Sequence, residues 1–289
     1  MEYALKVENL CKVYENTDFK LDNVTFSIPK GSIMGFVGKN GAGKSSTINS
    51  ILNITNRDSG VVKFFGCDMT DDTTSIREDI GVVFDHVTFH EELTPKKLEK
   101  IFNDTYTNWD KKLFFSYLKK FNIPSDKKIK KFSRGMTMKL SISIALSHKV
   151  RLLVLDEATA GLDPVVREEI LDIFLDFVED ENNSILISSH ISSDLEKIAD
   201  YITVIDEGKI ILAESKDTLI YEYGIARMKQ NDFNKLQQSE FISYRQRGLQ
   251  VEVLISDKSS FSKKYPNVTL DDAKLDEILP LMTKGEQTQ

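Results

Sequence analysis

Short apolar runs alternate with longer segments of helical spacing over most of the chain. Five runs have the length and predominantly apolar character of a buried strand: 33–37, 80–84, 152–155, 185–188 and 202–205. Segments with helical spacing separate the later runs, at about 165–179 and 192–199. Strands that are apolar throughout and alternate with helices are typical of a parallel sheet that is covered on both faces. We therefore predict an α/β protein.

Two segments of the main pattern differ in character from the rest. The first 65 residues are β-rich, with strict alternation at Val24, Phe26 and Ile28. The stretch from about 95 to 148 instead carries apolar residues at helical spacing with lysines between them. We interpret it as a helical insertion between two strands of the sheet.

The chain changes again after about residue 215. The remainder is polar, with one clear strand candidate at 249–255 and a terminal helix whose apolar positions include Leu275 and Ile278. This composition predicts a small α+β appendage. The expected division is a main domain over 1–215, a helical subdomain within it at about 86–148, and an accessory region over 216–289.

A glycine-rich loop follows the first buried strand. Residues 38–45 read Gly-Lys-Asn-Gly-Ala-Gly-Lys-Ser, a complete phosphate-binding loop (Walker A) placed between a strand and a helix. Four fixed positions match by chance in roughly one chain of this size in a hundred, and the flanking elements lower that frequency. A P-loop NTPase core is therefore expected. The predicted nucleotide-binding residues are Gly38, Asn40, Gly41, Ala42, Gly43, Lys44, Ser45 and Ser46.

Two residues of this loop have distinct predicted roles. Lys44 is expected to reach the β- and γ-phosphates of a nucleoside triphosphate, and the Ser45 hydroxyl to ligate Mg²⁺. The helix that follows presents its positive end to the same anion.

Two further buried strands end in polar side chains. The run 152–155 is followed by Asp156 and Glu157, and the run 185–188 leads to His190. At the carboxyl ends of strands beside a phosphate loop, Asp156 is expected to hold Mg²⁺ and Glu157 to orient the attacking water. His190 is expected to donate to the γ-phosphate. Taken alone, an acidic pair often just ends a strand at the surface, and a lone histidine there is more often structural.

The order of these motifs resembles a known family. Ser133-Arg134-Gly135-Met136 precedes the acidic strand, and Ala160-Gly161-Leu162-Asp163 follows it. Together with the phosphate loop and His190, this series is similar to the nucleotide-binding subunit of an ATP-binding cassette (ABC) transporter over residues 3 to about 215. The resemblance implies a head-to-tail dimer in which Ser133 and Gly135 of one subunit meet the γ-phosphate held by the other. It also implies that Asp163 organises the dimer interface and that Tyr14 stacks on adenine.

Two motifs depart from the family pattern. The family's signature usually reads Leu-Ser-Gly-Gly-Gln, whereas here Arg134 replaces its first glycine and Met136 its glutamine. The family also usually has a glutamine after the strand at 80–84, and this chain has Asp85. Asp85 is expected to act as a Mg²⁺ ligand and catalytic residue, with His86 supplying the missing hydrogen-bond donor. Arg134 is expected either to contact phosphate or to face solvent.

Composition restricts where such a chain can work. The 289 residues carry a net charge of −7, so no global positive field draws the protein onto nucleic acid, and no nucleic-acid partner is expected. Its two cysteines predict neither a disulfide framework nor a zinc site, which fits a reducing cytoplasm. No leader is expected at its start, and no apolar run approaches the ~20 residues of a membrane span.

These observations predict a cytoplasmic ATPase that uses ATP and Mg²⁺ and lies on the inner face of the cell membrane through a transmembrane permease. Its ATPase partner is a second copy or a homologous subunit. A groove near 85–95, with Val87, Phe89 and Leu93, is expected to receive the permease. A single cassette with a C-terminal appendage resembles bacterial exporter subunits for peptides, antibiotics or lipid-linked compounds. The alternatives are a regulatory ATP-binding module and an ABC ATPase that acts on nucleic acid or ribosomes.

Overall fold

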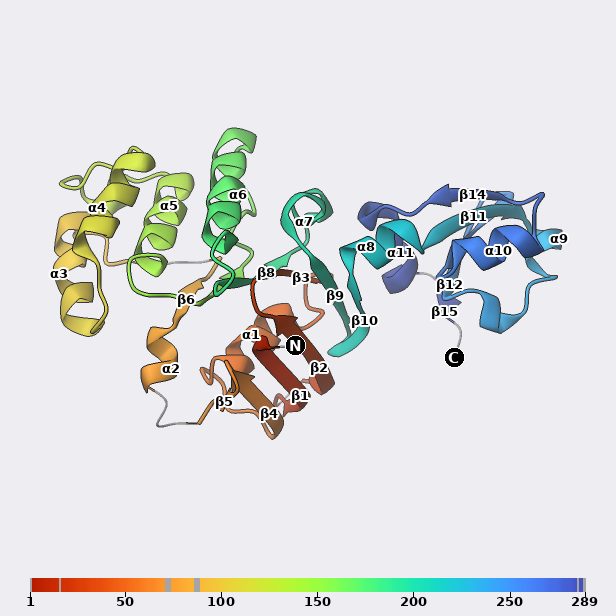
Figure 1. Cartoon of the computed structure of the whole chain (residues 1–289), viewed down its shortest axis with the longest axis horizontal. Coiled ribbons are helices and arrows are strands. Elements are labelled where there is room, and N and C mark those ends of the chain that lie inside the picture. The colour runs from red at the N-terminus through yellow and green to blue at the C-terminus, as the bar shows by residue number, and fades with distance from the viewer. Residues whose placement is uncertain (1, 16, 71–73, 86–88, 285, 288–289) are drawn as a thin grey trace.

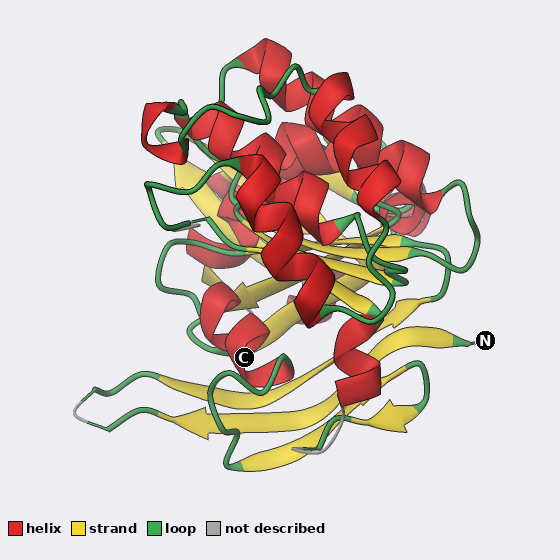
Figure 2. Cartoon of the chain, turned by 90° about the vertical axis from the view of Figure 1, so that its left-hand side faces the viewer, coloured by secondary structure: helices red, strands yellow, loops and turns green. Residues whose placement is uncertain are grey.

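The structure is a computed structural model that describes residues 2–15, 17–70, 74–85, 89–284 and 286–287. Two sheets and a group of helices form the cassette at the left and centre of Figure 1, and a third sheet with its own helices extends to the right. In Figure 2 most helices lie above the central sheet and an antiparallel sheet lies below it. The phosphate loop lies between these two sheets, at the end of a central strand.

The central sheet has six strands in the order β10-β9-β3-β8-β7-β6. Its strands are β3 (Ile33–Val37), β6 (Ile80–Val83), β7 (Leu152–Asp156), β8 (Ser184–Ser189), β9 (Tyr201–Asp206) and β10 (Lys209–Ser215). All neighbours run parallel except β10, which is antiparallel to β9. The predicted α/β fold is confirmed, and each of the five predicted runs forms a strand of this sheet.

Successive residues of the central strands face opposite sides of the sheet, as a period of two requires. Ile185 and Ile187 of β8 belong to the core shared with the upper helices, whereas Leu186 belongs to the core shared with the lower sheet. Both faces are covered, which is why these strands are apolar throughout.

The N-terminal sheet is antiparallel, in the order β2-β1-β4-β5. It consists of β1 (Tyr3–Val13), β2 (Lys20–Pro29), β4 (Ser59–Phe64) and β5 (Cys67–Asp68). The helix α1 (Lys44–Ile51) packs in the same core through Ile48 and Ile51, so it lies between the two sheets. The short helix α2 (Thr74–Glu78) leads into β6.

The upper helices come from the predicted insertion and from the βα units that follow it. They are α3 (Pro95–Thr105), α4 (Lys111–Lys120), the 3₁₀ turn η1 (Ile129–Lys131), α5 (Arg134–Ala145), α6 (Pro164–Val178) and α7 (Ser192–Ile198). Side chains cap four of them: Thr94, Asp110, Ser133 and Asp163 each accept a hydrogen bond from a backbone N–H of the first turn.

The region after β10 forms a five-stranded antiparallel sheet in the order β14-β11-β13-β12-β15. Its elements are α8 (Lys216–Tyr221), β11 (Gly224–Lys229), α9 (Gln230–Phe233), η2 (Gln238–Glu240), β12 (Ser243–Arg247), β13 (Gln250–Ile255), α10 (Lys258–Lys264), β14 (Thr269–Asp272), α11 (Leu275–Lys284) and β15 (Glu286–Gln287). It contains more strands than the one that the sequence analysis found.

The C-terminal sheet packs against the cassette through α11. Ile278 and Leu281 of α11 share the core of the upper helices, and the Leu275 N–H donates to Glu196 Oε1 of α7 at 2.9 Å. The other face of this sheet has a separate core around Val253 and Phe261. Residue 215 as a domain boundary stays a prediction.

Candidate functional site

The phosphate loop has the conformation that its glycines permit. Gly41 and Gly43 have φ angles of +83° and +115°, in the region where a side chain is strained. A Cβ on Gly38 would lie 2.5 Å from the Ile205 carbonyl oxygen, so the loop can pass this strand only as glycine. No side chain caps the first turn of α1, which begins at Lys44. Its N–H groups therefore point into the loop and can bind an anion.

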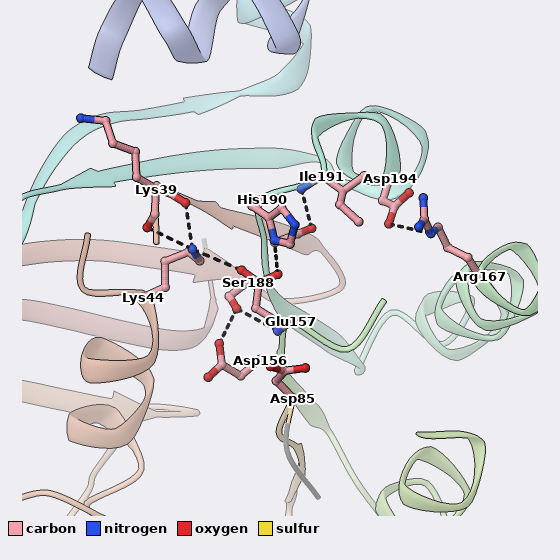
Figure 3. Close-up of polar contacts among 12 residues, drawn as sticks. Lys39, Lys44, Asp85, Asp156, Glu157, Arg167, Ser188, His190, Ile191 and Asp194 are labelled. Carbon is pink, nitrogen blue, oxygen red and sulfur yellow. Dashed lines mark hydrogen bonds and ion pairs between the residues drawn. The ribbon is translucent and has the colours of Figure 1, made fainter. Parts of the chain in front are cut away.

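Lys44 is buried at the centre of the loop. Its ammonium donates to the carbonyl oxygens of Gly38 at 2.8 Å and Lys39 at 3.3 Å, and it lies 3.2 Å from Glu157 Oε1 (Figure 3). The cation thus links the phosphate loop to the end of β7. This position suits a charge that has to contact the outer phosphates of a nucleotide.

Glu157 and His190 lie together beyond the ends of β7 and β8. Glu157 Oε2 is 2.7 Å from His190 Nδ1, and the Glu157 N–H is bound by the Ser188 hydroxyl at 3.1 Å. Glu157 has a φ of +53°, an unusual conformation for a glutamate, and the contacts on both sides hold it there. Its carboxylate is therefore fixed where it can orient a water molecule.

Asp156 is the last residue of β7 and is buried. Its Oδ1 accepts a hydrogen bond from the Ser188 hydroxyl at 2.5 Å. Ser188 therefore holds both acidic residues at the end of the sheet, a role that the sequence analysis missed. A hydroxyl one strand away from an acidic pair gives no signal until the parallel pairing of β7 and β8 is known.

One cavity of about 680 Å³ contains most of the predicted site. Its lining residues are Phe19, Lys39, Asn40, Gly41, Gly43, Lys44, Ser45, Ser46, Asp85, Glu157, Ala160 and His190. The structure thus brings Asp85, Glu157 and His190 together with the phosphate loop. Gly38 and Ala42 complete the loop, and the Ala42 carbonyl accepts from the Gly208 N–H at 2.9 Å.

An aromatic side chain lies beside the loop, but it is Phe19 that lines the cavity. Tyr14, which the family resemblance assigns to adenine, packs against Phe19 with ring centroids 5.8 Å apart. A Cβ on Gly43 would lie 3.0 Å from the Phe19 ring, so the ring contacts the loop directly. Phe19 is a second residue that the sequence analysis missed.

The signature residues lie away from this cavity in the same chain. Ser133 caps α5 by accepting from the Met136 N–H at 3.2 Å, and it is exposed. Gly135 follows in the first turn, and neither residue is among the described residues that line the cavity. Asp163 caps α6 by accepting from the Val166 N–H at 3.0 Å.

Arg134 makes a contact that the sequence analysis missed. Its side chain is 51% exposed, and its terminal nitrogen is 2.7 Å from Asp85 Oδ1. The two departures from the family pattern are therefore in contact with each other. His86 and Val87, for which roles were predicted, lie outside the described residues.

The donors near the cavity suit Mg²⁺ when a nucleotide supplies the remaining ligands. Ser45 and Asp85 line the cavity, and Asp156 lies at the end of the adjacent strand. All three offer oxygen, the donor that this ion prefers, and Mg²⁺ commonly takes only one or two carboxylates and completes its shell with phosphate and water.

Comparison with known proteins identifies the class. The ABC transporter family model matches residues 21–160. A lantibiotic transport ATP-binding protein of Streptococcus pyogenes is 35% identical over 74% of this chain and 91% of its own length. A bacitracin transport ATP-binding protein of Bacillus licheniformis is 32% identical over 73% of this chain and 69% of its own. A solved subunit of a Clostridium perfringens ABC transporter complex is 25% identical, with a TM-score of 0.65 over 75% of this chain and 90% of that one.

The chain belongs to the ABC transporter family. It is an ATP-binding subunit of the exporter type, and it hydrolyses ATP. In the part of the chain that the structure describes, no helix has the length and hydrophobicity that a membrane crossing needs.

Proposed function

We propose that this chain powers a membrane exporter by binding MgATP between two ATPase subunits, and that it acts through a separate transmembrane permease. The observation that carries the proposal is the single cavity in which Lys44, Glu157 and His190 meet the phosphate loop. Lys44 and His190 each contact Glu157 beside the phosphate loop, and this is where we expect the γ-phosphate of ATP to bind.

In the proposed reaction, water attacks the γ-phosphate and ADP leaves. Lys44 stabilises the charge on the β- and γ-phosphates, and Glu157 orients the attacking water by accepting its hydrogen bond. When both ring nitrogens carry a hydrogen, His190 donates from Nδ1 to Glu157 and from Nε2 to a γ-phosphate oxygen. Mg²⁺, held by Ser45 and Asp156 with Asp85 beside them, would neutralise phosphate charge when bound.

The second half of the site is proposed to come from another subunit. Ser133 and Gly135 lie at the open first turn of α5, outside the cavity of their own chain. A helix N-terminus with a serine cap and a glycine can approach a phosphate closely. A head-to-tail dimer supplies this turn to the γ-phosphate that the partner's loop holds.

A second hollow is proposed to receive the permease. It measures about 830 Å³ and lies between the segment before α3, η1 and the start of α5. Its lining residues are Phe89, His90, Glu91, Glu92, Ile129, Lys130, Phe132 and Thr137. Phe89 and Phe132 offer apolar surface, while Glu92 and Lys130 form an ion pair at the rim. A short helix of the permease fits such a surface. The transport names of the relatives support peptide antibiotics as the cargo class.

ATP turnover with and without Glu157→Gln tests the proposal. The substitution keeps the size of the side chain and removes its charge, so the variant should bind ATP and form a long-lived dimer. Its turnover should fall by roughly a hundredfold to ten-thousandfold, the usual contribution of a positioned base. Normal turnover in the variant would refute the role of Glu157.

Phe89→Glu tests the docking surface separately. Co-purification of this variant with the permease would refute that surface.

A further inference from the structure

Asp85 presents an electrostatic problem within the nucleotide cavity. It lines the cavity together with Glu157, so both acidic residues belong to the wall of the proposed site for a polyanionic nucleotide. Glu157 is compensated by Lys44 at 3.2 Å. The other cation of the wall, Lys39, is paired with Asp206 at 3.2 Å. A negatively charged carboxylate that has no cation beside it would repel phosphate at this place.

Arg134 presents the opposite problem. It is the first residue of α5, where the helix dipole is positive and a cation is unfavourable. Asp85 Oδ1 lies 2.7 Å from the guanidinium, so the carboxylate and the cation neutralise each other. The pair joins residues 49 positions apart.

A third segment fixes the position of the guanidinium. Gly161 follows β7 and has a φ of +67°, and a Cβ placed on it would lie 2.6 Å from one Arg134 nitrogen and 3.0 Å from its central carbon. The guanidinium therefore lies directly against the Gly161 backbone. Arg134 contacts the end of β6 and the loop after β7 from the first turn of the signature helix.

We propose that Arg134 is a positioning residue for nucleotide binding in its own subunit. It holds the Asp85 carboxylate and cancels its charge, so that a cavity wall with an acid at this position still accepts ATP. The inference rests on the proposed nucleotide site. It predicts that the two residues act as one unit. Neutralising either residue alone should change nucleotide affinity, and neutralising both should restore it.

The test measures affinity for a fluorescent ATP analogue, trinitrophenyl-ATP, without magnesium, where the charge of the wall acts without a metal. Arg134→Gln should weaken binding by roughly tenfold, equivalent to the coupling commonly measured for a contacting charge pair. Asp85→Asn should tighten binding, because it leaves Arg134 as an uncompensated cation. The double variant should return to within about threefold of the parent.

A matched cycle controls for the loss of a surface ion pair. Lys120 and Asp176 form an exposed pair at 2.9 Å between α4 and α6, away from the cavity wall. Lys120→Gln and Asp176→Asn change the same formal charges and should leave affinity within twofold. Arg134→Lys keeps the charge and should retain most of the affinity if charge compensation is the role of the residue. Thermal unfolding of every variant reports whether the fold is retained.

Two results with the arginine variant would overturn the inference. One is that Arg134→Gln binds as tightly as the parent. The other is that its loss of affinity persists when Asp85→Asn is added, because removing the Asp85 charge does not repair a structural defect. Should Arg134→Gln fail to fold, Asp85→Asn alone decides, because weaker or unchanged binding contradicts charge compensation. A parent chain that binds no nucleotide would overturn the proposed site together with the inference.

Discussion

The two halves of the nucleotide site differ in how complete they are within one chain. The phosphate-loop half is closed, because Lys44 is buried and Glu157 is held on one side by His190 and on the other by Ser188. The signature half is open, since Ser133 is exposed and its hydrogen bonds are with Met136 and Thr137 of its own helix. The difference indicates that one half is assembled by folding and the other by association.

The charged groups of the two halves differ in the same way. On the closed half, Glu157 has Lys44 of its own chain beside it. The open half presents the exposed N-terminus of α5 at Ser133 and Gly135, beside Arg134, whose charge Asp85 compensates. Such an end gains most when a phosphate arrives from outside.

Among these substitutions, Lys44→Ala should have the largest effect on ATP affinity, and it changes the closed half of the site. It removes the cation that contacts two loop carbonyls and Glu157, so ATP affinity should fall by at least about a hundredfold, as expected when a charge-assisted phosphate contact is lost. Isothermal titration with ATP measures the change. Affinity within tenfold of the parent would contradict the assignment of Lys44.

Gly135→Asp changes the open half of the site and leaves the phosphate-loop half intact. A Cβ at this position lies 3.6 Å from the nearest heavy atom, in Val166, so the substitution fits the isolated subunit. Its carboxylate should repel the phosphate that a partner presents, and ATP-dependent dimerisation should weaken by roughly tenfold or more. Light scattering with ATP measures dimer formation in an Glu157→Gln background, where Gly135→Ala is the size control. An undiminished dimer would contradict the role of the signature turn.

Phe19→Leu tests the aromatic side chain that lines the nucleotide cavity. The ring contacts the loop and lines the cavity, so its loss should weaken nucleotide binding by roughly tenfold, within the range measured for base stacking. Tyr14→Leu should have a smaller effect, because Tyr14 reaches the cavity only through Phe19. Titration of both variants with ATP ranks them, and a larger loss for Tyr14 would favour the assignment drawn from the family resemblance.

A substitution of His148 should have the smallest effect. This residue lies outside both halves of the site, and it is expected to affect the stability of the fold. Burial lowers the pKa of His148, which stacks on Tyr106 and donates from Nδ1 to the Glu78 carbonyl. The unfolded chain therefore takes up this proton more readily, and stability should decline as pH falls below about 6.5. His148→Gln should flatten the dependence of Tm on pH between about 5 and 7. An unchanged slope would show that His148 does not contribute.

The sequence indicates which residues form the closed half because local patterns determine them, and the structure brings most of them to one cavity. A glycine loop after a strand fixes Lys44, and the end of an apolar strand fixes Asp156 and Glu157. Long-range pairing carries no such signal. The contact of Arg134 with Asp85 depends on how α5 meets β6, and neither side chain is unusual in its local sequence.

The C-terminal sheet was largely missed for a related reason. The strand β12 reads Ser-Tyr-Arg-Gln-Arg, and its polar side chains pair across strands instead of packing in a core. Arg245 of β12 contacts the buried Glu252 of β13 at 2.7 Å, directly opposite it in the ladder. Polar strands of this kind resemble loops until their partners are known.

Mixing two inactive variants tests the central claim of a shared site most directly. Glu157→Gln has an intact signature turn, and Gly135→Asp has an intact phosphate-loop half, so a hybrid dimer contains one complete composite site. ATP turnover should reappear on mixing, at about a quarter of the parent rate if the subunits associate at random, since half of the dimers are hybrids with one of two sites intact. A mixture as inactive as its two components would contradict the account.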